Sequence, residues 1–216
     1  MPSSPKIQHP LALPALLNTI ITEEGPTTLI ICLSRTTFIR HLLNQLPPTH
    51  TLFTPTLDLL SNLNLANTRL VFCPSVPALL AYLSTLCQQN KSSEEGGGIN
   101  GGRLMLAYPL ALHAHTSSWS AQGLSQTAAA LVMAGRRTGM EVVVVEPVAP
   151  HNIHEARVDD YDDGRPDDAE DEDVWKQRVP ILSASSTKSG DSGRPWVGRT
   201  VETGQVFRRW FRFTEA

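Results

Sequence analysis

The chain has 216 residues, of which 41% are hydrophobic, so it can bury a sizeable core in a single domain over residues 1 to 216. Its 18 lysine and arginine residues and 21 aspartate and glutamate residues give a formal net charge of -3. This balance argues against electrostatic attraction of the whole chain to nucleic acid and leaves that role to a local basic patch. Three cysteines, Cys32, Cys73 and Cys87, make no disulfide framework and predict a reducing compartment.

The N-terminal segment predicts one helix. Residues 1 to 10 contain three prolines and are expected to be loose. Residues 11 to 21 are apolar, but Pro14 and Asn18 interrupt them, and they fall short of the roughly 20 residues that span a bilayer. Because a small-residue cleavage site is also missing, we expect a core helix or a partner-binding helix here, and no membrane association.

Strand and helix signals alternate from residue 29 to residue 86. Residues 29 to 33 form an apolar run of strand length, and Ser34 is a suitable cap for the helix that follows. Residues 54 to 65 predict a short helix that begins with proline. Residues 70 to 73 predict a second strand, after which Ser75 begins another helix.

The strongest pattern is a strand, a long helix and a second strand between residues 104 and 146. The apolar run at residues 104 to 108 and the four valines at residues 142 to 145 lack polar alternation. Strands with this character are buried on both faces, as in parallel sheets that helices cover on both sides. The helix between them ends at Gly139, which suits a left-handed C-terminal cap.

Two segments lack core-forming residues. Residues 91 to 102 are rich in serine, glutamate and glycine and predict a flexible insert. Residues 155 to 178 predict a disordered acidic loop, because residues 159 to 173 hold ten acidic residues against one arginine.

The end of the chain predicts antiparallel strands over residues 180 to 184 and 196 to 213. The earlier alternation of strands and helices favours right-handed crossovers. The expected fold class is therefore α/β, with a mainly parallel β-sheet flanked by helices and extended at one edge by antiparallel C-terminal strands.

The motif of a phosphate-binding loop is missing. Such a loop follows the pattern G-x-x-x-x-G-K-[ST], and none of the four lysines follows a correctly spaced glycine. The glycines between residues 96 and 102 precede a strand, whereas a phosphate loop follows a strand and opens a helix. We expect no catalytic residue, no cofactor and no bound metal.

Histidines supply a second candidate chemistry. His113 and His115 form one close pair, and His151 and His154 form another; both pairs follow predicted strand ends, where open α/β sheets usually bind ligands. A zinc site requires three or four converging ligands, so we favour solvent-exposed loop histidines. The alternative is a small α/β enzyme that uses His113, His115 or His151. Cys73 lies in an apolar context, which predicts a raised pKa and an inert thiol.

The C-terminal segment interleaves arginine with aromatic residues, which permits phosphate pairing and base stacking. The predicted nucleic-acid-binding residues are Arg199, Arg208, Arg209 and Arg212. A structural interpretation, which we favour, has the aromatic side chains in the core and the arginines outside. A protein-binding surface is the third possibility, because such surfaces also favour tryptophan and arginine.

Residues 103 to 150 resemble the core of RecA-type recombinases. The sequence R-L-M-L-A-Y at residues 103 to 108 is similar to that family's strand L-L-I-V-D-S, and G-M-E-V-V-V-V-E-P at residues 139 to 147 is similar to G-V-A-V-V-V-T-N-Q. Residues 28 to 43 resemble the strand and helix that follow the family's phosphate loop. Tyr108 stands where the family has its metal-binding carboxylate.

The resemblance implies a RecA-type paralogue without ATPase motifs, similar to a small subunit of the Shu complex, which assists recombinase assembly on DNA. It implies a nuclear, non-catalytic protein that serves homologous recombination and DNA repair in a heteromer with a RecA-like paralogue. A recombinase and DNA are the further partners that it implies. The alternative within this fold is an inactive RecA-like scaffold subunit of Elongator, which supports tRNA modification.

Overall fold

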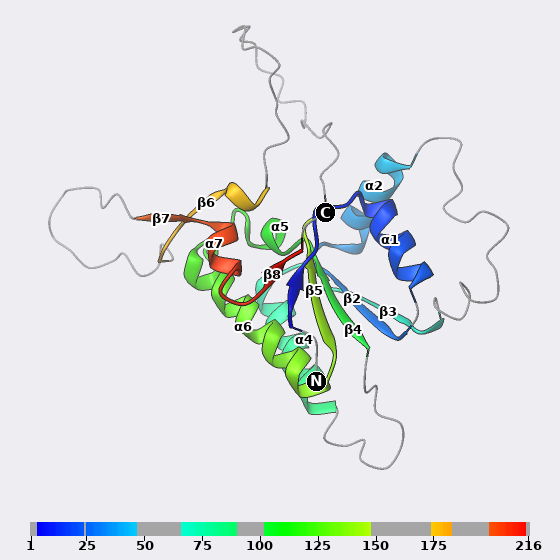
Figure 1. The fold of residues 1–216 in the computed structure, drawn as a ribbon. Helices are drawn as coiled ribbons and strands as arrows, with labels where there is room; N and C mark the ends of the chain where they lie inside the picture. The colour runs from blue at the N-terminus through cyan, green and yellow to red at the C-terminus, as the bar shows by residue number, and fades with distance from the viewer. Residues whose placement is uncertain are drawn as a thin grey trace, which may run out of the picture.

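The computed structural model of the protein describes residues 4–23, 25–46, 66–89, 102–147, 174–182 and 199–214. Six parallel strands form one sheet in the order β3-β2-β4-β5-β1-β8 (Figure 1). Their bounds are β1 (Lys6–Ile7), β2 (Thr27–Ile31), β3 (Thr68–Phe72), β4 (Arg103–Ala107), β5 (Glu141–Val145) and β8 (Arg212–Phe213). The predicted α/β fold class, with a RecA-like parallel sheet flanked by helices, is confirmed.

Helices cover both faces of this sheet. The α-helices are α1 (Leu13–Thr22), α2 (Arg35–Gln45), α4 (Val76–Gln89), α5 (Pro109–His113), α6 (Ala121–Thr138) and α7 (Thr203–Phe207). Helices α1 and α2 pack together on one side, and α4 and α6 pack together on the other (Figure 1). This division follows from right-handed crossovers, because β1 and β2 lead in one direction across the sheet, whereas β3 and β4 lead in the other.

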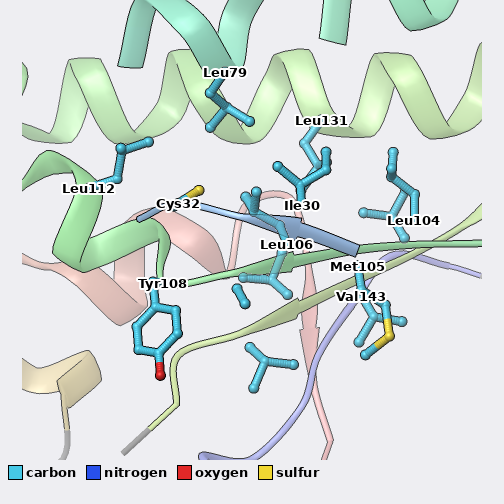
Figure 2. Packing of buried hydrophobic residues seen from close by; sticks show 14 of the residues in the cluster. Ile30, Cys32, Leu79, Leu104, Met105, Leu106, Tyr108, Leu112, Leu131 and Val143 are labelled. Atoms are coloured by element: carbon cyan, nitrogen blue, oxygen red, sulfur yellow. The ribbon is translucent and has the colours of Figure 1, made fainter. Parts of the chain in front are cut away.

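The centre of the core lies where β2, β4 and β5 meet these helices. Every residue of β2 is buried, as are the last four residues of both β4 and β5. Figure 2 shows Leu79 of α4 and Leu131 of α6 over Ile30 and Leu106, whereas Met105 points to the opposite face. Burial on both faces explains why these strands are apolar without alternation.

Two sequence signals for helix termini are confirmed. The side chain of Ser34 accepts a hydrogen bond from the backbone N–H of Thr37 and so caps α2. Gly139 ends α6 in the left-handed conformation, with φ of 67°, which glycine adopts without steric cost. Residues 54 to 65, which predict a short helix, lie outside the described part of the chain.

The N-terminal expectations need two corrections. Lys6 and Ile7 are not loose, because they form β1 between β5 and β8. A two-residue strand has no periodicity to detect, and its neighbours fix it: Gln8 N–H donates to Val144 O at 2.9 Å. The helix that the sequence offered as a core or partner-binding element is a core helix, with Leu13 and Leu16 fully buried.

The C-terminal region also differs from the prediction. Strand β8 runs parallel to β1 and so continues the parallel sheet. The antiparallel pair is a separate sheet of β6 (Arg178–Pro180) and β7 (Thr200–Glu202). Residues 203 to 207 are helical, as α7, although the aromatic and apolar residues there predict a strand. Tertiary packing decides this region, since α7 packs against α6.

The predicted disordered acidic loop ends earlier than residue 178. Residues 174 to 178 contain the short 3-10 helix η1 (Val174–Lys176) and the start of β6. Trp175 anchors this segment, because its ring packs edge-on against Phe207 at a centroid distance of 5.2 Å and against Phe213 at 5.5 Å. The rest of that loop, and residues 91 to 101 of the predicted insert, lie outside the described residues.

Helix α6 approaches β5 closely at a glycine. A Cβ atom added to Gly135 would lie 2.1 Å from Cγ2 of Val142. We expect Gly135→Ala to lower the free energy of unfolding by about 1–3 kcal/mol, because either the helix or the valine must move. Urea denaturation measures this change. Met133→Ala, at an exposed position of the same helix, is the control and should change stability by less than about 0.5 kcal/mol; equal effects would contradict the tight contact.

Candidate functional site

The carboxyl end of the parallel sheet is the first place to look for a ligand site, because open α/β sheets bind ligands where neighbouring strands lead to opposite faces. Strand β2 leads to α2, whereas its neighbours β3 and β4 lead to α4 and α5–α6. Cys32, Cys73, Tyr108 and Glu146 follow β2, β3, β4 and β5, and all four are buried. The sheet therefore gathers thiol, phenol and carboxyl groups along one edge.

Glu146 closes the N-terminus of α5. Its Oε2 accepts a hydrogen bond from the N–H of Leu110 at 2.8 Å, and its Oε1 accepts one from Ala111 at 3.4 Å. The cap residue itself, Tyr108, offers no side-chain hydrogen bond to the helix, so the carboxyl group supplies the acceptors from 36 residues away. Burial raises the pKa of Glu146 to about 8, although the two N–H groups act in the opposite direction. The carboxyl group is consequently mostly protonated at neutral pH.

Tyr108 occupies the position at which the RecA-type resemblance implies a metal-binding carboxylate. It adopts a left-handed conformation, with φ of 65°, and its ring points away from the layer of α4 and α6 (Figure 2). The ring meets His41 of α2 at a centroid distance of 5.9 Å, and the hydroxyl has no hydrogen-bond partner among the described residues. Burial, and then the nearby Glu146, raise the pKa of Tyr108, so the phenol stays neutral. A neutral phenol is a poor substitute for the carboxylate that Mg²⁺ prefers.

The connection between β1 and α1 has the strand–loop–helix order of a phosphate-binding loop. Residues 8 to 12 contain no glycine and no lysine. The first backbone N–H of α1, that of Leu13, donates to Oε1 of Gln45 at 2.7 Å, and Pro14 has no N–H to offer. Gln45 thus accepts the hydrogen bond that a phosphate oxygen would otherwise accept from the N-terminus of α1. Sequence analysis missed this connection because β1 gave no strand signal.

The two histidines of the pair in the enzyme alternative lie in different environments. His113 is fully buried and is not a solvent-exposed loop residue; its Nδ1 lies 3.1 Å from the carbonyl oxygen of Ser118, and its Nε2 lies 2.9 Å from Oγ1 of Thr127. Burial lowers the pKa of His113, which favours the neutral ring. His115 is exposed. No group of three or more possible metal ligands occurs in the described ranges, while His151 and His154 fall outside them.

The two described cysteine thiols are free and buried. Burial raises the pKa of Cys32, with smaller contributions from Glu146 and Cys73, and burial also raises the pKa of Cys73. A protonated buried thiol is a weak nucleophile, so the predicted inertness of Cys73 agrees with its surroundings. The side chain of Cys87 lies outside the described part of the chain.

The four predicted nucleic-acid-binding arginines are all exposed, and they form no ion pair with any described residue. Arg208 and Arg209 follow α7, and Arg212 lies in β8. Arg199 precedes β7, so this three-residue strand, roughly 10 Å long, separates Arg199 from the start of α7. The structure therefore brings three of the four arginines into one turn of chain and leaves Arg199 at the other end of β7.

The aromatic residues of this segment divide between core and surface. Phe207 and Phe211 are buried, with ring centroids 5.8 Å apart, so the favoured structural interpretation holds for them. Phe213 is half-buried and lies under Arg208, whose guanidinium carbon is 5.3 Å from the ring centroid. Trp210 is 37% exposed. A helix and a turn produce this division, rather than the strand alternation that the sequence predicts.

Sequence analysis missed two basic residues of the same region. Lys176 and Arg178 are exposed and join the C-terminal segment through η1 and β6, where Nε of Arg178 donates to Oγ1 of Thr200 at 3.0 Å. Residues 174 to 182 and 199 to 214 together contain six basic side chains and one acidic side chain, Glu202. We call the six the basic segment: Lys176, Arg178, Arg199, Arg208, Arg209 and Arg212. Twenty residues separate its two parts, so spacing alone gave no signal.

Comparison with known proteins leaves the family open: no model of a known protein family matches the chain, and no curated protein matches it. In the part of the chain that the structure describes, no helix has both the length and the apolar character needed to cross a membrane.

The buried carboxyl group predicts how stability depends on pH. Because the pKa of Glu146 rises from 4.5 to about 8 on folding, the folded state keeps a proton that the unfolded state releases. Its contribution to stability is therefore full at low pH and is lost as pH rises from about 4.5 to 8. We expect Glu146→Gln, an isostere of the protonated group, to remove this loss. Above pH 8 the variant should exceed the wild type in free energy of unfolding by at least about 1 kcal/mol, the equivalent of one pKa unit.

Urea denaturation of both proteins at several values between pH 5 and 9 measures this difference. Glu141→Gln is the matched control, because Glu141 lies at the other end of β5 and pairs with Lys6 at the half-exposed surface. The control should retain the fall in stability that Glu146 causes. Parallel stability curves for wild type and Glu146→Gln would contradict the assignment of a protonated carboxyl group.

Proposed function

We propose that this chain is a non-hydrolysing RecA-like subunit. It acts in the nucleus in homologous recombination and DNA repair, as part of a heteromer with a second RecA-like protein, and it contacts nucleic acid through the basic segment. A recombinase is the further partner that this role requires.

The observation that carries the proposal is the β1–α1 connection of a RecA-like sheet. A nucleotide-hydrolysing protein needs free N–H groups and a lysine there, with a carboxylate nearby to hold the metal ion. Here Gln45 occupies the first N–H of α1, Pro14 removes the next, and Tyr108 ends β4. Internal side chains satisfy these groups, which supports assembly rather than turnover as the role of the fold.

The surface chemistry supports contact with a polyanion. The chain as a whole is acidic, with a net charge of -3, yet the basic segment contains six cations close to a single carboxylate. Because these exposed arginines form no ion pair with a described residue, this segment can attract nucleic acid locally. The enzyme alternative based on His113 loses support, since both ring nitrogens of that buried residue face hydrogen-bond partners.

The heteromer is tested by affinity purification of the tagged protein from the nuclei of its native cells, with identification of the co-purifying proteins. We expect a RecA-like paralogue in a fixed stoichiometry, because an α/β subunit without turnover requires a partner to act on filaments. Recovery of tRNA-modification proteins would replace recombination by the Elongator-type role. Recovery of the chain alone, under conditions that keep other nuclear complexes intact, would contradict the subunit proposal.

Nucleic-acid contact is tested with the double variant Arg208→Glu, Arg209→Glu. We expect weaker DNA binding and a decrease of about 2 in the slope of log K against log salt concentration, because two phosphate contacts are lost. Fluorescence anisotropy with labelled DNA measures both. Arg136→Glu, Arg137→Glu is the control of equal charge change, since both arginines are exposed in the last turn of α6. Equal losses of DNA affinity in both double variants would show that net charge, and not the basic segment, determines binding.

A further inference from the structure

We propose that the basic segment binds single-stranded nucleic acid in preference to duplex, and that Trp210 is the residue on which a base stacks. This inference rests on the proposed function, because it names the form of nucleic acid that the same segment recognises. It adds an aromatic contact to a surface that has so far been described by its charge.

Trp210 stands out among the exposed apolar side chains. Of the large hydrophobic residues that are exposed in the described part of the chain, it is the one aromatic residue. Its backbone is fixed, because its N–H donates to the carbonyl oxygen of Phe207 at 2.9 Å, and Phe211, the next residue, is buried. When a base stacks on a surface aromatic residue whose backbone is already fixed, only side-chain freedom is lost.

The surroundings of Trp210 are cationic. Arg208 and Arg209 precede it and Arg212 follows, all three exposed, and residues 203 to 214 contain no acidic side chain. Arg208 is held against the Phe213 ring, which restricts its motion. Phosphates on either side of a stacked base would therefore meet exposed arginines that are the neighbours of the tryptophan in the chain.

A protein partner fits this arrangement less well than a nucleic acid. The centre of a protein interface is apolar and depleted in charge, with a polar rim. Between residues 199 and 214, Trp210 is the one exposed apolar side chain among arginine, threonine and glutamine, and the exposed Ile181 and Leu182 lie at the other end of β7, beside Arg199. A single ring among cations matches the repeated unit of a single strand, namely a flat base beside a phosphate.

The preference for single strands follows from the same geometry. In a duplex the bases are already stacked and paired, so an indole ring gains a base face only by disrupting the helix. In a single strand every base offers a free face, and stacking contributes without regard to sequence. Charge attracts both forms, whereas Trp210 adds affinity for one of them.

The test measures binding of the full chain to a labelled thirty-nucleotide thymidine strand and to a thirty-base-pair duplex. Trp210→Ala should weaken single-strand binding roughly five- to hundredfold, and duplex binding by less than about twofold. The salt slope should stay unchanged, because no charge is removed. Trp210→Phe, which keeps an aromatic face, should retain most of the single-strand affinity. Tryptophan fluorescence should fall on addition of the thymidine strand in the wild type but not in Trp210→Phe.

Three outcomes would overturn the inference and leave the proposed function to its own tests. Equal losses of single-strand and duplex binding in Trp210→Ala would exclude base stacking as the source of the preference. Unchanged single-strand affinity in Trp210→Ala, together with a loss in Arg208→Glu, Arg209→Glu, would make the surface purely electrostatic. Binding of neither DNA form by the wild type would remove the nucleic-acid site, while co-purification of a RecA-like partner would still support the subunit role.

Discussion

The structure depends on one constraint, which is that three adjacent strands have to be covered on both faces. Strands β2, β4 and β5 are almost wholly buried and carry apolar side chains on both faces. Helices must therefore cover each face of the sheet to keep these side chains from water. Reversal of the crossover direction after β3 satisfies this requirement, because it places α4 and α6 opposite α1 and α2. The same reversal places β4 beside β2. Tyr108, which follows β4, therefore lies close enough to α2 for its ring to contact His41.

Sequence patterns revealed the parts of the fold that have their own local signal. The four valines of β5 favour a strand, the serine before α2 favours a helix start, and the glycine after α6 favours a helix end. The tertiary structure has all three features. Strands β1 and β8 contain two residues each and carry no such signal, since their pairing across about 200 residues creates them. Helix α7 fails for the opposite reason: its valine and phenylalanine favour a strand, but packing against α6 and η1 overrides that preference.

The candidate sites show the same limit. The exposed arginines after α7 could be predicted because they are adjacent in sequence, as could the absence of a phosphate-loop motif. The contacts that decide the chemistry could not, because Gln45 reaches Leu13 over 32 residues and Glu146 reaches Leu110 over 36. Side chains that close a helix terminus from a distant element leave no spacing rule in the chain. Lys176 and Arg178 joined the basic segment through strand pairing for the same reason.

Helix termini at the carboxyl edge of the sheet bear on where the proposed polyanion would bind. Gln45 occupies the N-terminus of α1, Ser34 that of α2, Ser75 that of α4 and Glu146 that of α5, in each case through a backbone N–H. An anion at this edge would have to displace an internal acceptor before it gained a hydrogen bond, and such an exchange returns little net free energy. The exposed guanidinium groups after α7 form no ion pair with a described residue. The proposed binding of a polyanion is therefore expected at the end of the chain, away from the position that a nucleotide would occupy in a RecA-like sheet.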